Sequence, residues 1–141
     1  PYQFSLNISE TLLNEESFSS WLEEKLFQFK IPAKQLTLEI NESNFLWKNE
    51  RIKSRIKDLK SIGCQISLDK FGDRYSELNH ILELNPDSIK IDVNSINGLT
   101  KNRSAILFVK GLVEITRDAR VKLIANRVDK LEIQSTVESL G

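Results

Sequence analysis

Five short runs of β-branched and other apolar residues, separated by longer stretches of helical periodicity, constrain the fold of this 141-residue chain most. The runs cover residues 2–8, 36–40, 65–68, 88–91 and 121–125. Alternation of strand-like and helix-like segments is typical of repeated βα units that build a parallel sheet. The sequence therefore predicts one α/β domain over residues 1–141, with about five βα units.

The segments between the runs carry helix signals. Ile52, Ile56, Leu59 and Ile62 recur at helical spacing, and Gly63 follows where a left-handed C-terminal cap is expected. Further helices are predicted over 18–29, which ends before Pro32, over 106–116, and over 129–140. For the last helix we expect Asp129 as the N-cap and one mainly apolar side, formed by Leu131, Ile133, Val137 and Leu140.

The composition excludes several classes of protein. Lys and Arg number 20, as do Asp and Glu, so no net charge steers the whole chain toward nucleic acid or an anionic membrane. No apolar run is long enough to span a bilayer and no secretory signal is visible, so we expect a cytoplasmic setting without a membrane segment. Cys64 and His80 have no neighbours with metal-site spacing, and we interpret both as structural.

One predicted helix is rich in basic residues. Glu50 and Asp58 interrupt these cations, which spread around the helix, so we interpret them as an ordinary solvated face. RNA binding is the alternative, and it would depend strongly on salt. The cations are Lys48, Arg51, Lys53, Arg55, Lys57 and Lys60.

Polar side chains lie where each of the five runs ends. Because the carboxyl ends of parallel strands meet at one rim, we expect these residues to lie close together. Carboxylate and carboxamide oxygens can bind a hard divalent cation, and a lysine can activate water or stabilise phosphate charge. The alternative is that polar residues simply begin the loops. The residues are Asn7, Glu39, Asp69, Lys90 with Asp92, and Asn126.

Several motifs occur in order along nearly the whole chain. They are Leu-Asn-Ile-Ser at 6–9, Leu-Glu-Ile-Asn-Glu-Ser at 38–43, Ser-Leu-Asp-Lys-Phe-Gly at 67–72, Tyr-Ser at 75–76, Lys-Ile-Asp at 90–92 and Ile-Ala-Asn-Arg-Val-Asp at 124–129. With these motifs the chain resembles the EAL domain family of phosphodiesterases, which hydrolyse cyclic di-GMP to linear pGpG. The resemblance implies a TIM-type (β/α) barrel, here with an incomplete set of units, and two metal ions, usually magnesium or manganese.

The resemblance also assigns expected roles. Those of Asn7, Glu39 and Asp69 are metal ligands, and that of Lys90 is to position the attacking water. Glu42 matches a second glutamate near the site, while Asp92 and Tyr75 are expected to contact the ligand. These residues retain part of the family's machinery.

Other positions depart from the family pattern. Lys70 stands where the family has a second aspartate, Asn126 replaces a glutamate, Arg127 replaces a glycine, and Asp129 replaces the final glutamate. At an effective dielectric of about 20, a unit charge at about 4 Å contributes about 4 kcal/mol, or roughly a thousandfold in metal affinity. We expect Lys70 to pair with Asp69 or Glu39 in place of a metal; the alternative is that Lys70 extends into solvent.

The sequence is therefore interpreted as a degenerate, truncated EAL domain that lacks the family's N-terminal Glu-Ala-Leu strand and its last barrel strand. We expect an inactive regulatory module that contacts a protein partner and needs no cofactor. Alternatives are a magnesium- or manganese-dependent phosphodiesterase in a longer chain, a cyclic di-GMP receptor without hydrolysis, and an RNA-associated regulator. Open sheet edges also allow a homo-oligomer.

Overall fold

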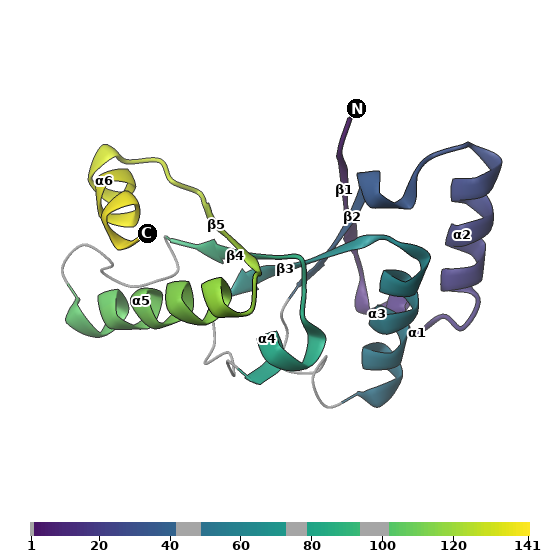
Figure 1. Ribbon diagram of the computed structural model, residues 1–141, viewed down its shortest axis with the longest axis horizontal. Helices are drawn as coiled ribbons and strands as arrows, with labels where there is room; N and C mark the ends of the chain where they lie inside the picture. The colour runs from purple at the N-terminus through teal and green to yellow at the C-terminus, as the bar shows by residue number, and fades with distance from the viewer. Residues whose placement is uncertain (1, 42–48, 73–78, 94–101) are drawn as a thin grey trace. The chain divides into compact units, whose positions relative to one another are not determined.

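A computed structural model describes residues 2–41, 49–72, 79–93 and 102–141 (Figure 1). Glu42 and Tyr75, two of the predicted site residues, lie outside these ranges. The chain divides into two compact units, Pro1–Asp69 and Lys70–Gly141. The division falls within one strand, so the polar residues predicted for the rim are distributed over both units.

The described residues of the first unit form three parallel strands in the order β1-β2-β3. These are β1 (Phe4–Ile8), β2 (Leu36–Asn41) and β3 (Gln65–Phe71), and β3 runs into the second unit. The helices of the first unit are α1 (Glu10–Asn14), α2 (Phe18–Gln28), the 3-10 helix η1 (Ala33–Gln35) and α3 (Glu50–Ile62). The three strands begin at or within two residues of the predicted positions.

Helix α3 forms as its sequence predicts. The Asn49 side chain caps its start by accepting a hydrogen bond from the Arg51 backbone N–H at 3.1 Å. Gly63 ends it at φ 102°, a left-handed conformation that glycine adopts without steric cost, so the predicted cap is confirmed. Ile52, Ile56 and Leu59 are buried, which places the apolar face of α3 in the core of the unit.

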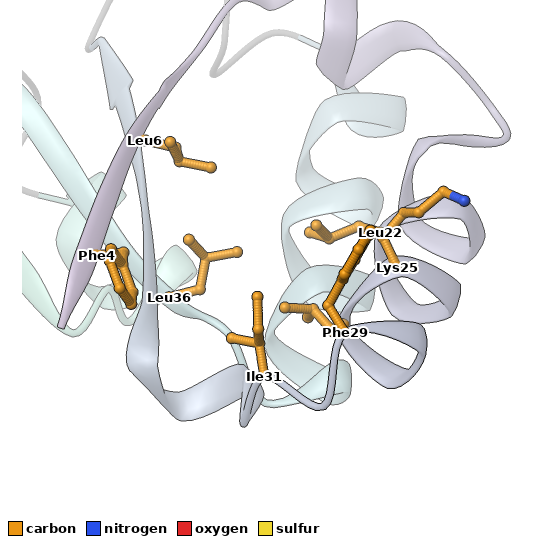
Figure 2. Close-up of a pocket in the computed structure, with 8 residues that line it drawn as sticks. Phe4, Leu6, Leu22, Lys25, Phe29, Ile31 and Leu36 are labelled. Carbon is orange, nitrogen blue, oxygen red and sulfur yellow. The ribbon is translucent and has the colours of Figure 1, made fainter. Parts of the chain in front are cut away.

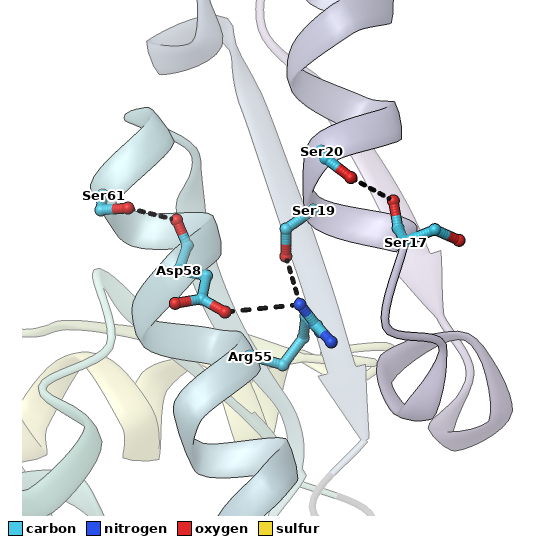
Figure 3. A network of polar contacts seen from close by, with 6 residues as sticks. All are labelled: Ser17, Ser19, Ser20, Arg55, Asp58 and Ser61. Carbon is cyan, nitrogen blue, oxygen red and sulfur yellow. Dashed lines mark hydrogen bonds and ion pairs between the residues drawn. The ribbon is translucent and has the colours of Figure 1, made fainter.

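A polar network links α2 to α3 (Figure 3). Arg55 Nη1 donates to Ser19 Oγ at 3.3 Å and contacts Asp58 Oδ2 at 3.4 Å. Among the atoms of the described residues, Arg55 Nε is buried without a hydrogen-bond partner. The guanidinium thus joins the two helices but is only partly satisfied.

The second unit contains two parallel strands, β4 (Ser88–Asp92) and β5 (Lys122–Asn126), with Ser88 beside Lys122 and Asp92 beside Asn126. Its helices are α4 (Asn79–Leu84), α5 (Arg103–Asp118) and α6 (Leu131–Leu140). Helix α5 contacts β5 and α6 and buries Val109 and Leu112. The amphipathic sequence of α5 therefore supplies the helical side of this core.

Two expectations about the helices need correction. Helix α6 has Lys130 at its N-cap, without a side-chain hydrogen bond there, so the predicted Asp129 cap is wrong. Leu131 is 81% exposed, whereas Ile133, Val137 and Leu140 are half-buried, so the apolar side of α6 begins two residues later than expected. The short helices α1 and α4 were not predicted, because five or six residues are too few for a clear helical period.

The basic residues of α3 fit the solvated interpretation only in part. Arg51 and Lys57 are exposed, whereas the side chains of Lys53 and Arg55 are largely buried, at 18% and 16% exposed. Lys48 lies outside the described residues. Lys53 pairs with Glu50 at 3.0 Å and Arg55 pairs with Asp58 at 3.4 Å, both between neighbours on the same helix.

Within the described part of the chain, no helix combines the length and apolar character needed to cross a membrane.

Candidate metal and ligand site

Strands β1 to β3 present one polar face in the first unit. Asn7 lies beside Glu39, and Asn41 lies beside Asp69. Because side chains alternate along a strand and paired residues of parallel strands share a face, Asn7, Glu39 and Asp69 lie on the same face of the sheet. The register thus brings the three predicted metal ligands together.

The opposite face of these strands is apolar. Leu36, Leu38 and Ile40 of β2 are buried there, as are Ile66 and Leu68 of β3. On the polar face, Thr37 Oγ1 and Gln65 Oε1 lie 3.2 Å apart and form a hydrogen bond. Alternation in the sequence therefore separates a face that builds the core from a face that is available for chemistry.

The oxygens on the polar face suit a hard divalent cation such as magnesium or manganese. Glu39 is only 8% exposed, Asp69 is half-buried and Asn7 is exposed. Across the described ranges, no group of three or more His, Cys, Asp and Glu residues is arranged to hold a metal ion. The donor set of the first unit, two carboxylates and one carboxamide, fits one cation.

Lys70, near the end of β3, has an unusual backbone conformation. Its φ is 57°, in the left-handed region, and its side chain is exposed. The expected pairing of Lys70 with Asp69 or Glu39 stays a prediction. Asp and Asn tolerate left-handed backbone better than other residues with side chains, so lysine is a costly choice here.

Gly72, two residues after Lys70, lies close to Phe108 of helix α5. At φ 89° a Cβ added to Gly72 would lie 3.1 Å from Phe108 Cε1. The backbone conformation therefore favours glycine at this position, and a larger residue would also press on the Phe108 side chain. The contact of Phe108 with Gly72 was not predicted from the sequence. The spacing of apolar residues in α5 does not tell whether an aromatic residue packs in the core or against a loop.

In the second unit, one residue contacts both candidate oxygen ligands. Asp92 is buried and lies beside Asn126 in the register of β4 and β5. Arg127 Nη1 lies 3.3 Å from Asp92 Oδ2, and the Arg127 backbone N–H donates to Asn126 Oδ1 at 2.9 Å. The carboxylate is therefore paired with a cation, and the carboxamide oxygen is used in a local turn. This pair of oxygens does not fit a divalent cation.

Two further predicted residues belong to this unit. Lys90 is half-buried and lies on the same face of β4 as Asp92, two residues earlier. Asp129 is exposed and lies outside any strand, between β5 and α6. The sequence identified Arg127 as an altered position but did not predict its ion pair with Asp92. The one signal in the sequence was that Arg127 directly follows a predicted strand, and that strand lies beside the strand of Asp92.

An apolar pocket of about 290 Å³ lies on the other side of the first unit, between the β1–β2 strands and α2 (Figure 2). Phe4 and Leu6 of β1 border it together with Phe29, and all three remain at least half exposed. Among the described residues that line the pocket, the exposed surface is apolar and Lys25 carries a charge. The pocket is thus chemically distinct from the polar face.

The EAL domain family matches residues 1–141. The chain is 29% identical over 140 residues to cyclic di-GMP phosphodiesterase PdeF of Escherichia coli, covering 99% of the chain and 19% of that protein. It is 31% identical over 137 residues to cyclic di-GMP phosphodiesterase PdeA of Borreliella burgdorferi, covering 97% of the chain and 20% of that protein. The chain thus spans about a fifth of the length of these relatives.

Solved structures show the same fold. The EAL domain of Mycobacterium smegmatis DcpA superposes with a TM-score of 0.85 at 24% identity, covering 99% of the chain and 62% of that domain structure. Klebsiella pneumoniae BlrP1, in a complex with manganese and cyclic di-GMP, gives 0.87 at 23% identity, covering 99% of the chain and 36% of that protein. The predicted α/β barrel class is confirmed, and the chain belongs to the EAL domain family.

Proposed function

We propose that this chain is a degenerate part of an EAL domain that does not hydrolyse cyclic di-GMP and acts in the cytoplasm as a regulatory module through contact with a protein. The observation that carries the proposal is the position of Lys70. It is an exposed cation in left-handed backbone at the end of β3, where the family pattern has a second aspartate.

Charge is the reason that this substitution matters. A bridging carboxylate binds two cations at once, whereas an ammonium group repels both. Even at a dielectric close to that of water, a unit charge at about 4 Å changes the interaction by about 1 kcal/mol, and partial burial increases that figure. The substitution therefore lowers metal affinity twice, because the attraction of the carboxylate is lost and the repulsion of the ammonium group is added.

The first unit retains the residues for one cation. Asn7, Glu39 and Asp69 would hold it, and magnesium or manganese would supply Lewis-acid polarisation of a phosphate oxygen. Lys90 on β4 would take the role of the family's water-positioning lysine, as the sequence resemblance implies. A single occupied cation site supports ligand retention better than hydrolysis, because a family site with two metals stabilises both attacking and leaving oxygens.

Contact with another polypeptide is supported by the apolar surface of the first unit. Phe4, Leu6 and Phe29 are exposed around the pocket between β1 and α2, and β1 pairs on one side with β2. An exposed apolar surface of this kind marks a contact site for another polypeptide segment. We assign this surface to an extended polypeptide segment with apolar side chains.

Hydrolysis of cyclic di-GMP with added manganese tests the catalytic part of the proposal. The chain is expected to release no pGpG above the background without protein. The double variant Lys70→Asp with Asn126→Glu, compared in parallel, is expected to bind manganese more tightly than the natural chain. Turnover of cyclic di-GMP by the natural chain would overturn the proposal.

The apolar surface can be tested separately with the fluorescent dye ANS, which reports exposed apolar grooves. Leu6→Asp is expected to remove most of the dye signal. Leu107→Asp is the matched control, because Leu107 is also exposed but lies on α5 of the other unit. Equal dye binding by the two variants would argue against the assigned surface.

A further inference from the structure

We infer that Arg127 is a built-in cation that takes the position of a divalent metal ion at Asp92 and Asn126, and so determines that this end of β4 and β5 stays free of metal. The inference rests on the proposed function and deepens it, since it names a residue that keeps the second unit from binding a cation. Lys70 explains the loss at the end of β3, whereas Arg127 acts within the second unit alone.

The geometry supports a replacement of the cation by the side chain. Asp92 and Asn126 are direct partners in the parallel register, so their side chains leave the sheet on one face. Arg127 places its guanidinium 3.3 Å from Asp92 Oδ2 and its backbone N–H 2.9 Å from Asn126 Oδ1. The first contact is an ion pair and the second is a hydrogen bond, and both engage oxygen atoms that a metal ion would need.

Burial makes this pairing consequential. The Asp92 side chain is 10% exposed, so its charge requires a compensating partner inside the protein. The Arg127 side chain is 65% exposed, so it can be changed without opening the core. Because Asp92 is buried and Arg127 is accessible, Arg127 can be replaced and the binding of a metal ion at Asp92 can then be measured.

The backbone at Arg127 identifies the informative variant. Its φ is 59°, a left-handed conformation in which glycine is relaxed and arginine is not. Arg127→Gly therefore removes the guanidinium while it preserves the backbone path and the N–H that contacts Asn126. Arg127→Gln removes the charge but keeps a polar side chain, and Arg127→Lys keeps the charge.

Titration of the chain with manganese chloride, followed by calorimetry and by the electron paramagnetic resonance signal of free manganese, tests the inference without any assay of hydrolysis. Arg127→Gly and Arg127→Gln are each expected to bind manganese at least about tenfold more tightly than the natural chain, because a repelling charge beside the acid is gone. Arg127→Lys is expected to stay within about threefold of the natural chain. Adding Asp92→Asn to Arg127→Gly is expected to abolish the gain.

Two results would overturn the inference. One is equal manganese affinity in the natural chain, Arg127→Gly and Arg127→Gln, with far-UV circular dichroism showing that the variants are folded. The other is a gain in Arg127→Lys as large as that in Arg127→Gly. Neither result depends on whether the natural chain hydrolyses cyclic di-GMP, so failure of this inference is distinguishable from failure of the proposed function.

Discussion

Removal of the ion pair between Arg127 and Asp92 is expected to have a measurable energetic signature. The perturbation is a double-mutant cycle built from Arg127→Gly, Asp92→Asn and the two changes together. The cycle isolates the interaction between the two side chains from the other contacts that each residue makes. It also separates the loss of the ion pair from the relief of left-handed backbone at Arg127, because that relief is common to both variants that contain glycine.

The structure sets the expected size of the coupling. Opposite unit charges about 3.3 Å apart attract by about 1 kcal/mol at the dielectric of water and by about 5 kcal/mol at an effective dielectric of about 20. The carboxylate is largely buried, but the guanidinium is 65% exposed and therefore screened by solvent. We expect a coupling free energy of about 1 kcal/mol, near the lower of these two limits.

The assay is equilibrium unfolding in urea followed by far-UV circular dichroism for the natural chain and the three variants. Arg127→Gly alone is expected to change the free energy of unfolding by less than the coupling, because relaxed backbone offsets part of the lost pairing. High salt should reduce the coupling, since the exposed guanidinium is open to screening. A coupling below about 0.3 kcal/mol at low salt would refute the reasoning, because it would mean that Asp92 does not depend on Arg127.

Three further predictions concern stability and reactivity. Leu112→Ala is expected to destabilise the chain by about 2–5 kcal/mol in urea unfolding, whereas Leu107→Ala, also on α5, should cost less than about 0.5 kcal/mol, because Leu112 is 0% and Leu107 58% exposed; equal losses would contradict the packing described for α5. Burial raises the pKa of the Cys64 thiol, so Cys64 should react with a disulfide reagent at pH 8 much more slowly in the folded chain than in urea, and equal rates would show that the thiol is accessible. Arg55→Met removes a buried Nε that lacks a partner among the described residues and should change the free energy of unfolding by less than about 1 kcal/mol, while Arg55→Ala, which also removes the packed stem, should cost more.

The strands could be predicted from sequence because each is a short apolar run that ends at a polar residue. Strand β2 was placed to within one residue at its end, and β4 likewise. The start of β1 was placed two residues early, because Tyr2 and Phe4 are both compatible with a strand but only Phe4 pairs with a neighbour in the register. Helix ends were less predictable, as Asp129 shows, because a capping residue type does not establish that its side chain reaches the first turn.

The candidate site was predictable as a set of positions but not as a set of contacts. Asn7 and Glu39 fall side by side because strand ends meet in a parallel sheet, which the spacing of the runs already implied. The exposure of Lys70 was not predictable, because it depends on a left-handed backbone angle at the end of β3. The pairing of Arg127 with Asp92 depends on the register of β4 and β5, a long-range relation that one sequence does not specify.

The number of manganese ions bound per chain tests the central claim most directly. Anomalous diffraction from a crystal of the natural chain soaked in manganese and cyclic di-GMP would count and place them. The account predicts at most one ion, at the oxygens of Asn7, Glu39 and Asp69, and none at Asp92 and Asn126. Two well-occupied manganese ions bound to these residues would contradict the claim that Lys70 and Arg127 have replaced metal-binding chemistry with fixed cationic side chains.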